Sequence, residues 1–393
     1  MAKKDNGYIS IKESRKIIKY NIKMMKYYES LKRAKKEESE YTTSMRNPEN
    51  IIEIQDLKTC FFTDNGTVMA VNGVSFDIPK NKIVGVVGES GCGKSVTSLS
   101  VMQLVQAPQG QVVEGQIRFN RSVKGEGEST EQNVAYDIAK MPTEAMYKIR
   151  GKDITMIFQE PMTSLNPVFT IGFQLDEATF IHNPETPKET AKEHSIELLT
   201  KVGISMPEHV YNSYPHELSG GMRQRVMIAM ALAGNPKLII ADEPTTALDV
   251  TIQAQILELL KDIQRKEGCS IMLITHDLGV IAEMADEVVV MYAGKVIEKG
   301  TVRDIFHNPL HPYTIGLQKS KPMLTSNGNE PLYSIPGNVP NPINLPDTCY
   351  FKNRCNKCTE KCNGHYPCEI KVSDTHTVSC WLYAKGGETN ESR

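Results

Sequence analysis

The chain has 393 residues, which is enough for one large domain with appendages or for two modest domains. Its formal net charge of −2 gives no argument for a nucleic-acid partner. No stretch of the sequence reaches the roughly 18 consecutive apolar residues that a membrane-spanning helix needs. The lysine-rich N-terminus has no apolar segment of the secretory kind, so the sequence predicts a cytosolic protein.

Residues 1–47 are expected to form a basic, amphipathic helical extension. From Ile11 to about Lys36, lysines and arginines surround a narrow helical stripe of apolar residues. The stripe consists of Ile11, Ile18, Ile22 and Met25. Such a helix could dock on a membrane surface or on a partner protein. It could equally be a solvated extension that packs loosely on its own domain, and the stripe favours neither alternative.

Residues 48–318 carry alternating strand and helix signals, which predict an α/β domain with a mixed sheet. Short, continuous apolar runs predict strands that are covered on both faces. Three such runs are Ile83–Val87, Leu238–Ala241 and Ile271–Ile274. Further on, Val288–Tyr292 and Lys295–Glu298 flank an Ala-Gly pair and predict an antiparallel hairpin.

The other segments are less regular. Residues 121–143 are polar and weakly patterned, which predicts a surface insertion. Residues 319–346 are rich in proline and lack periodicity, as is typical of a linker. Residues 347–393 are expected to form a small cysteine-rich domain that cannot bury much core unaided.

A glycine-rich loop follows the first predicted strand. Residues 88–95 fit the pattern G-x-x-x-x-G-K-[S/T] without a mismatch and precede a predicted helix. Glycines let the backbone N–H groups turn inward, so the loop and the helix N-terminus can cradle a phosphate chain. Lys94 would reach the β- and γ-phosphates, and the Ser95 hydroxyl would be a ligand of Mg²⁺. The nucleotide contacts expected here are Gly88, Glu89, Ser90, Gly91, Cys92, Gly93, Lys94, Ser95 and Val96.

Two adjacent carboxylates, Asp242 and Glu243, end the second predicted strand. In a parallel sheet this end lies at the same edge as the phosphate loop. Successive strand residues point to opposite sides, so Asp242 suits the Mg²⁺ shell and Glu243 suits orienting and deprotonating the attacking water. His276, after the third strand, could contact the γ-phosphate, and Gln159 could ligate Mg²⁺ and sense the γ-phosphate.

A second helix N-terminus is expected after Leu218. Ser219 is a good N-cap, and Gly220 and Gly221 leave the first-turn N–H groups unobstructed. This end is bare enough for a phosphate to approach closely. Because the phosphate loop already binds this chain's own nucleotide, the second site is best explained by an ATP carried on another subunit.

These motifs together resemble the ABC ATPase family over about residues 50–318. Residues 88–95 match its Walker A motif, 218–222 its signature, Asp242-Glu243 its Walker B motif and 247–249 its D-loop, with Gln159 in the Q-loop and His276 in the H-loop. The resemblance implies a P-loop core with a RecA-like mixed sheet, an antiparallel β subdomain and a helical signature subdomain. It also implies a head-to-tail dimer.

In such a dimer, the signature of one subunit contacts the ATP of the other. Matching the motif residue by residue assigns that contact to Ser219, Gly220, Gly221 and Gln224, with Asp249 in the D-loop. An aromatic side chain is expected to stack on adenine. Counting along the first strand indicates Phe61, with Phe62 as the alternative.

Other stretches resemble the oligopeptide, dipeptide and nickel importer branch of the family: Tyr214–Glu217, Pro161–Pro167, the residues that follow Asp242-Glu243, and His311–Thr314. This implies an importer motor at the cytoplasmic face of the membrane, with two permease subunits, an external peptide-binding protein and a second ATPase, which the family favours as a paralogue. A soluble ABC ATPase acting on nucleic acid or ribosomes is the alternative, but it would usually show a coiled-coil insertion or a second cassette. A GTPase or small-molecule kinase would lack the signature.

Six cysteines crowd into the C-terminal segment: Cys349, Cys355, Cys358, Cys362, Cys368 and Cys380. They could supply one four-thiolate site, and their spacing does not choose between zinc and an iron–sulfur cluster. Residues 347–355 resemble the C-terminal motif of peptide-importer ATPases, some of which hold a 4Fe-4S cluster. That resemblance implies Cys349, Cys355, Cys362 and Cys380 as ligands. The Cys355-x-x-Cys358 spacing keeps zinc open, and reduced or disulfide-linked cysteines are the third alternative.

Overall fold

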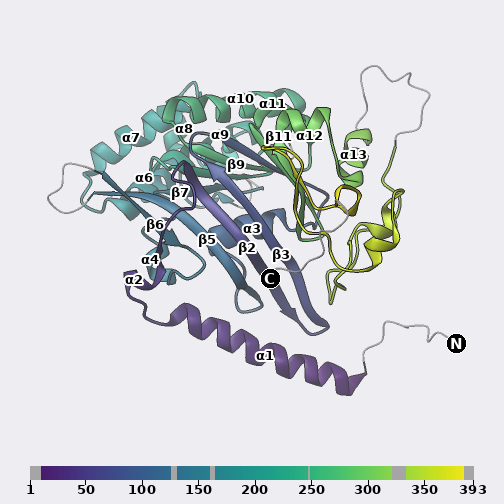
Figure 1. The fold of residues 1–393 in the computed structure, drawn as a ribbon. Helices are drawn as coiled ribbons and strands as arrows, with labels where there is room; N and C mark the ends of the chain where they lie inside the picture. The colour runs from purple at the N-terminus through teal and green to yellow at the C-terminus, as the bar shows by residue number, and fades with distance from the viewer. Residues whose placement is uncertain (1–9, 125–130, 160–163, 247, 321–332, 385–393) are drawn as a thin grey trace.

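Two β-sheets organise the computed structural model, which describes residues 10–124, 131–159, 164–246, 248–320 and 333–384 (Figure 1). In the described residues, one sheet is antiparallel and has the strand order β1-β6-β5-β2-β3. Its strands are β1 (Thr42–Thr43), β2 (Asn50–Thr63), β3 (Gly66–Pro79), β5 (Gly110–Lys124) and β6 (Glu131–Asp137). This sheet corresponds to the predicted antiparallel subdomain.

The other sheet is mixed and has the order β12-β13-β11-β10-β4-β9-β8-β7 across the described ranges. Its central strands β10, β4, β9, β8 and β7 run parallel to one another. The strands are β4 (Ile83–Val87), β7 (Ile154–Ile157), β8 (Leu238–Asp242), β9 (Ser270–Thr275), β10 (Glu287–Tyr292), β11 (Lys295–Thr301), β12 (Ile370–Lys371) and β13 (Thr377–Val378). The predicted buried strands and the β10–β11 hairpin are thus confirmed.

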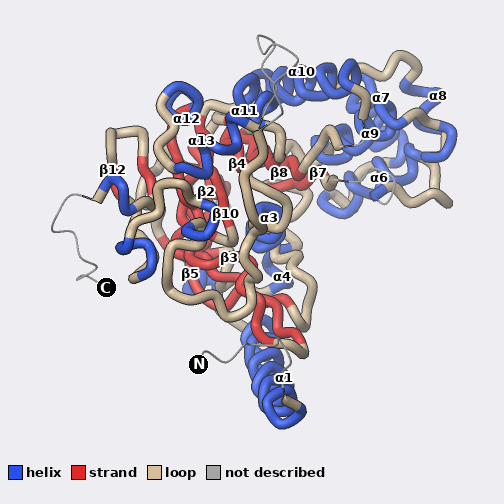
Figure 2. The backbone as a smooth tube through the Cα atoms, turned by 90° about the vertical axis from the view of Figure 1, so that its right-hand side faces the viewer, coloured by secondary structure: helices blue, strands red, loops and turns tan. Residues whose placement is uncertain are grey.

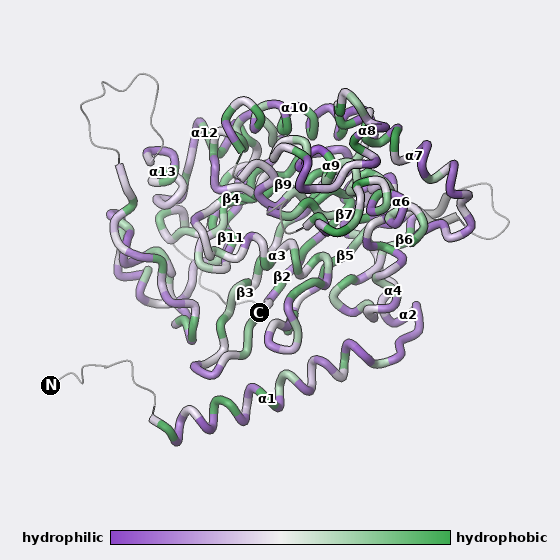
Figure 3. The backbone as a smooth tube through the Cα atoms, turned by 180° about the vertical axis from the view of Figure 1, so that it is seen from behind, coloured by the Kyte–Doolittle hydropathy of each residue, from purple (hydrophilic) through white to green (hydrophobic). Residues whose placement is uncertain are grey.

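Strands β4, β8 and β9 are buried along their whole length because a different core covers each face. In β4, Ile83 and Val87 belong to the core shared with the outer helices, whereas Val84 and Val86 belong to the core shared with the antiparallel sheet. Side chains alternate between faces along a strand, so a strand covered twice must be apolar throughout. Figure 3 shows the hydrophobic stretches gathered in these interior strands.

The helices form two groups in Figure 2. One group of helices in mutual contact lies at the β7 end and corresponds to the predicted signature subdomain: α6 (Ile171–His182), α7 (Lys188–Lys201), α8 (Pro207–Asn212) and α9 (Gly220–Leu232). The others are α2 (Glu38–Tyr41), α3 (Lys94–Val101), α4 (Thr143–Met146), α10 (Val250–Glu267), α11 (Leu278–Met284), α12 (Val302–His307) and α13 (Pro312–Lys319). Among the described helices, none is long and apolar enough to cross a bilayer.

The predicted N-terminal helix is α1 (Ile11–Arg33), and one of its faces packs on the antiparallel sheet (Figures 1 and 3). Asn21 is buried and donates from Nδ2 to the Thr63 carbonyl at 2.7 Å. The ring of Tyr28 stacks on Phe62 with a centroid distance of 6.2 Å. These contacts favour an extension that packs on its own domain, while Ile11 and Tyr27 remain exposed on the helix.

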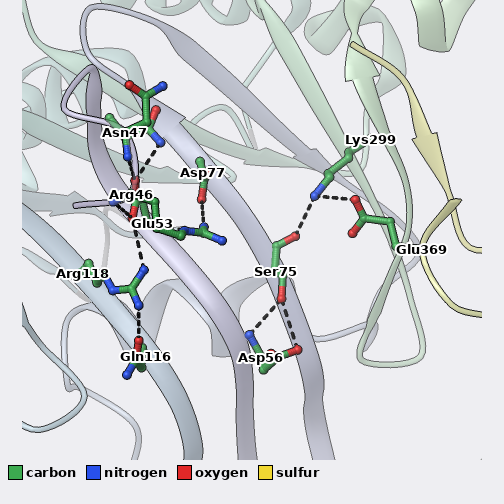
Figure 4. A network of polar contacts seen from close by, with 11 residues as sticks. Arg46, Asn47, Glu53, Asp56, Ser75, Asp77, Gln116, Arg118, Lys299 and Glu369 are labelled. Atoms are coloured by element: carbon green, nitrogen blue, oxygen red, sulfur yellow. Dashed lines mark hydrogen bonds and ion pairs between the residues drawn. The ribbon is translucent and has the colours of Figure 1, made fainter. Parts of the chain in front are cut away.

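A polar network fastens the residues after α2 to this sheet (Figure 4). The buried carboxylate of Glu53 accepts hydrogen bonds from the backbone N–H groups of Arg46 and Asn47 at 2.9 and 2.8 Å. Arg46 also pairs with Asp77 on β3 at 2.7 Å. Burial would raise the pKa of Glu53, but these donors outweigh it and lower that pKa. Glu53 is therefore an anionic anchor for the chain that enters the sheet.

The predicted surface insertion at 121–143 is wrong for part of its length. Residues 131–137 form β6, which pairs with β5 and buries Ala135 and Tyr136. The apolar alternation around Tyr136 is too short to stand out among polar neighbours. Residues 125–130 lie outside the described residues.

The cysteine-rich segment joins the main sheet, because β13 pairs with β11. At this junction the buried Glu298 accepts hydrogen bonds from the backbone N–H groups of Leu310 and His311 at 2.7 and 2.9 Å. Its other contact is His376, whose Nε2 lies 2.8 Å from Glu298 Oε1. The boundaries 1–47, 48–318, 319–346 and 347–393 stay predictions, but the last segment is built onto the sheet of the second.

The buried His311 predicts a specific pH dependence of stability. Its Nδ1 caps α13 by accepting a hydrogen bond from the Tyr313 N–H at 3.0 Å, and burial lowers the pKa of His311 to about 4 despite the attraction of Glu298. Because imidazole titrates near 6.5 in an unfolded chain, the neutral ring stabilises the fold fully above that pH. This contribution of about 3 kcal/mol is lost as the pH falls towards 4.

His311→Asn retains a capping acceptor and does not titrate. Denaturant unfolding between pH 7 and pH 4 should therefore show a smaller loss of the unfolding free energy in the variant than in the wild type. Parallel pH profiles for the two proteins would contradict the assignment.

Candidate functional site

The phosphate loop lies between β4 and α3. Gly93 has φ +99°, and a Cβ there would lie 2.3 Å from the Ala70 carbonyl oxygen, so only glycine fits. The buried Lys94 donates from Nζ to the Gly88 and Glu89 carbonyls at 2.8 and 3.2 Å. The ammonium group of Lys94 thus lies against the loop backbone at the N-terminus of α3, where a bound anion would be attracted.

Two of the three predicted Mg²⁺ ligands meet here, Ser95 from the start of α3 and Asp242 from the end of β8. The Ser95 hydroxyl donates to Asp242 Oδ1 at 3.0 Å. Asp242 is buried, and burial raises its pKa although Ser95 and Lys94 act in the opposite direction. A hydroxyl and a carboxylate oxygen at contact distance are hard donors of the kind that Mg²⁺ prefers. The residues present therefore fit the ion.

The carboxylate of Glu243 is held by side chains from three directions. Gln159 Nε2 donates to its Oε2 at 3.2 Å, and the Thr246 hydroxyl donates to the same oxygen at 2.9 Å. His276 Nδ1 lies 3.2 Å from Oε1. The structure thus brings the three predicted catalytic residues, Glu243, His276 and Gln159, together at one edge of the sheet, because they follow the ends of β8, β9 and β7.

The backbone of Glu243 is constrained as well. It adopts φ +47°, a left-handed conformation that costs a non-glycine residue about 1–2 kcal/mol. Its N–H donates to the Ile274 carbonyl of β9 at 2.8 Å, which holds the turn in place. Thr246 was not predicted from the sequence. Its position three residues after Glu243 is the signal that could have indicated it.

The choice between the two candidate adenine-stacking residues follows from α1. Phe62 is buried and its ring stacks on Tyr28, so it is not available to a nucleotide. Phe61 is half-buried and belongs to the opposite face of β2. Phe61 therefore remains the candidate, as predicted.

The signature residues start α9 in the helical subdomain. Ser219 caps the helix by accepting from the Met222 N–H at 3.3 Å, and both Ser219 and Gly220 are exposed. A Cβ at Gly221 would lie 2.9 Å from Ile252 Cγ2 of α10, so glycine is required by packing as well as by access. Asp249 caps α10 through the Ile252 N–H at 3.0 Å. Ala247, the first D-loop residue, lies outside the described residues.

Gln224 differs from the other predicted signature contacts in its burial. Its side chain is buried inside the domain, and its Nε2 has no hydrogen-bond partner among the described residues. The residue lies more than one turn into α9, where the helix already packs against the core. This burial does not favour Gln224 as a contact of a neighbouring nucleotide, and the contacts assigned to Ser219, Gly220, Gly221 and Gln224 stay predictions.

The C-terminal cysteines are all free thiols, including Cys349, Cys355, Cys362 and Cys380. Burial raises the pKa of Cys349 to about 12, and the neighbouring thiols of Cys362, Cys380 and Cys355 act in the same direction. Within the described ranges, no group of three or more His, Cys, Asp or Glu side chains is placed to hold a metal ion. The residues as arranged do not fit a cluster or zinc, so the iron–sulfur assignment receives no support here and no step below uses it.

Comparisons with known proteins agree with this site. The family model described as "ABC transporter" matches residues 71–246, and that described as "Oligopeptide/dipeptide transporter, C-terminal region" matches residues 297–362. The oligopeptide transport ATP-binding protein AppD of Bacillus subtilis is 50% identical over 86% of this chain and 98% of its own length. OppD and DppD of the same organism, named for oligopeptide and dipeptide transport, are 51% and 49% identical over 84% and 86% of the chain, covering 88% and 97% of their own lengths.

Solved structures show the same fold. A dimeric structure of MJ0796, a bacterial ABC transporter cassette, matches with a TM-score of 0.54 and 25% identity over 64% of this chain and 99% of its own. CbiO1 from Clostridium perfringens, part of an ABC transporter complex, has the same TM-score and identity over 66% of this chain and 92% of its own.

The fold and the phosphate-loop site define an ABC-type ATPase. The chain belongs to the family of ATP-binding proteins of oligopeptide and dipeptide ABC transporters, since its relatives match it over most of both lengths.

The position of Thr246 leads to a testable prediction. Thr246→Val keeps the side-chain shape but removes the hydrogen bond that orients Glu243, which should lower the ATP turnover number about fivefold, corresponding to about 1 kcal/mol. Thr246→Ser retains the hydroxyl and should stay near the wild-type rate. Steady-state ATPase assays check both; a Thr246→Val variant that turns over at the wild-type rate would show that this hydrogen bond does not orient Glu243 for catalysis.

Proposed function

We propose that this chain binds MgATP at residues 88–96 and hydrolyses it as one half of a head-to-tail dimer, thereby energising peptide uptake through separate membrane subunits. The observation that carries the proposal is the position of Glu243. Its carboxylate, oriented by Gln159, Thr246 and His276, lies at the same sheet edge as Lys94 and the Ser95–Asp242 pair.

Binding is assigned to the loop and to the strand ends beside it. Lys94 and the loop N–H groups would counter the phosphate charge, and Phe61 would stack on adenine. Ser95, Asp242 and Gln159 would hold Mg²⁺, which supplies positive charge to the phosphates. Glu243 would orient the attacking water and accept its proton, and His276 would position both relative to the γ-phosphate.

The dimer follows from the exposed N-terminus of α9. Ser219 and Gly220 are exposed at the N-terminus of α9 in the helical subdomain, whereas the phosphate loop precedes α3 in the other part of the fold (Figure 2). Binding an ATP held by a neighbour would use this end, with Asp249 beside it. The neighbour is a paralogous ATPase or a second copy of this chain.

Docking on membrane permeases is supported by an exposed apolar patch that follows Gln159. Phe169 and Phe173 stack with their ring centroids 4.6 Å apart and are 42% and 52% exposed, and Val168 is 69% exposed. Such a cluster suits a short amphipathic helix from another protein. We propose that the docking groove lies around Gln159 and residues 160–175, of which 160–163 lie outside the described residues. The chain would thus sit peripherally at the cytoplasmic face.

The cargo class comes from the relatives, which are named for oligopeptide and dipeptide transport. We propose oligopeptides or dipeptides delivered by an external binding protein, rather than nickel. The cargo itself would be selected by the permease and binding subunits.

The dimer model predicts that two variants of the complex, purified with its membrane subunits, lose hydrolysis at different sites. Glu243→Gln should keep ATP affinity but lower turnover at this chain's site by at least about 100-fold, because the proton acceptor is lost. Ser219→Arg should leave ATP bound to this chain's loop yet impair hydrolysis at the neighbour's. Single-turnover hydrolysis and nucleotide titration measure both effects.

Glu267→Gln is a matched control, because Glu267 lies at the opposite end of α10 from Asp249 and its ion pair is with Lys201. Normal turnover by Glu243→Gln would refute the assignment of the base, and an unaffected neighbour in Ser219→Arg would refute the shared site.

A further inference from the structure

The C-terminal segment reaches the phosphate loop through one arginine. Arg354 ends the short 3₁₀ helix η2 (Lys352–Arg354), and its two terminal nitrogens lie 2.9 and 3.1 Å from the two carboxylate oxygens of Glu89. Glu89 is the second residue of the loop 88–95. This is the bidentate fork geometry that makes arginine–carboxylate pairs both strong and directional.

Arg354 is fixed independently of Glu89. Its Nε donates to the Pro336 carbonyl at 3.0 Å and a terminal nitrogen donates to the Ile335 carbonyl at 3.3 Å. The guanidinium lies 5.8 Å from the ring centroid of Tyr292, and the side chain is only 6% exposed. An arginine held in this way loses little conformational entropy when it pairs. Its fixed position therefore determines where the Glu89 carboxylate lies.

The backbone of Glu89 also has a partner in the C-terminal part of the chain. Its N–H donates to the hydroxyl of the buried Tyr313, on α13, at 2.8 Å. Tyr313 and Arg354 both lie within residues 297–362, the part that matches the peptide-transporter C-terminal region. The loop is therefore held on its outer side, at both backbone and side chain, by residues that the general ATPase motifs do not include.

The charge balance of the loop explains why such a partner matters. An acidic side chain within a phosphate cradle repels the triphosphate, and the repulsion is stronger at a partly buried site than in bulk water. Glu89 has only 26% of its side chain exposed, so solvent screens it incompletely. Pairing with Arg354 cancels this charge and directs the carboxylate towards the C-terminal segment.

We propose that Arg354 is a positioning residue for ATP binding: it neutralises and orients Glu89, so the C-terminal segment completes the phosphate loop of its own chain. The inference rests on the proposed function of residues 88–95 as the site of the triphosphate.

The test uses the complex with its membrane subunits and compares Arg354→Gln with the wild type. Loss of the guanidinium leaves the Glu89 carboxylate unpaired beside the phosphates, so the KM and the dissociation constant for ATP should rise about tenfold. The turnover number should change by less than about twofold, since Glu243 and its partners are untouched. The loss of affinity should diminish from ATP to ADP to AMP as the ligand charge falls.

Rescue variants separate charge from mere scaffolding. Glu89→Gln in the Arg354→Gln background removes the repelling carboxylate and should return ATP affinity to within about twofold of wild type. Arg354→Lys retains the charge without the fork and should lie between the two. If Arg354→Gln does not fold, Glu89→Gln alone decides: it leaves the Arg354 charge uncancelled beside the phosphate loop and should bind ATP more tightly than the wild type, and unchanged affinity would contradict the proposal.

Lys299→Gln is the matched control. It breaks the 2.9 Å ion pair with Glu369, which also ties the C-terminal segment to the domain but lies on β11 (Figure 4). It should leave ATP affinity unchanged.

Three results would overturn the proposal: unchanged ATP affinity in Arg354→Gln, a loss that Glu89→Gln does not rescue, or an equal loss in Lys299→Gln. Lys94→Ala distinguishes this from failure of the proposed function. If Lys94→Ala binds ATP normally, the loop is not the triphosphate site; if it fails to bind while Arg354→Gln is normal, only the inference is wrong.

Discussion

The parallel pairing of β4, β9 and β8 is the constraint on which the rest of the structure depends. Each of these strands is buried along its whole length between two cores, so their register and direction cannot change without exposing apolar side chains. Their carboxyl ends consequently meet at one edge. The phosphate loop, the Asp242-Glu243 pair and His276 are chain continuations from that edge, which is why residues far apart in sequence form one site.

At this edge the neighbouring residues Asp242 and Glu243 have different surroundings. Asp242 lies on the strand and is buried against Ser95, whereas Glu243 leaves the strand through a left-handed turn and meets Gln159, Thr246 and His276. In the proposed mechanism, the first carboxylate holds the cation and the second activates the nucleophile. The exposed end of α9 belongs to a different subdomain, and we propose that it binds the nucleotide of a neighbouring subunit.

Much of this site could be predicted from the sequence, because the strands are short apolar runs and the polar residues follow them directly. The loop 88–95 was located by its glycine pattern after a strand, and Asp242 and Glu243 by their position at a strand end. His276 and Gln159 were located by the same rule with weaker support, which the resemblance to the ABC ATPase family strengthened. Thr246 was not predicted, although its position three residues after Glu243 is a signal for it. Arg354 could not be found, because its role depends on a contact across 265 residues of chain. The burial of Gln224 and the stacking of Phe62 on Tyr28 were equally invisible, since each depends on what packs against a helix or strand.

The fold of the polar segments was predicted less well, for a related reason. Residues 131–137 pair with β5 through backbone hydrogen bonds, and the side-chain pattern of this segment does not predict that pairing. The C-terminal segment looked like a separate domain because its composition changes sharply, yet β13 extends the main sheet and Glu298 ties both parts together. Composition reports which side chains are present, whereas strand pairing decides where the segment lies.

The claim that a neighbour must complete the catalytic pocket is tested most directly by the protein-concentration dependence of ATP hydrolysis. The specific activity of the detergent-free chain, alone and mixed with its partner ATPase, would be followed over a hundredfold dilution at saturating MgATP, with the oligomeric state measured by light scattering. The account predicts that specific activity falls on dilution as dimers dissociate and is restored by added partner. A dilute monomer that hydrolyses ATP at the full, constant specific rate would contradict it.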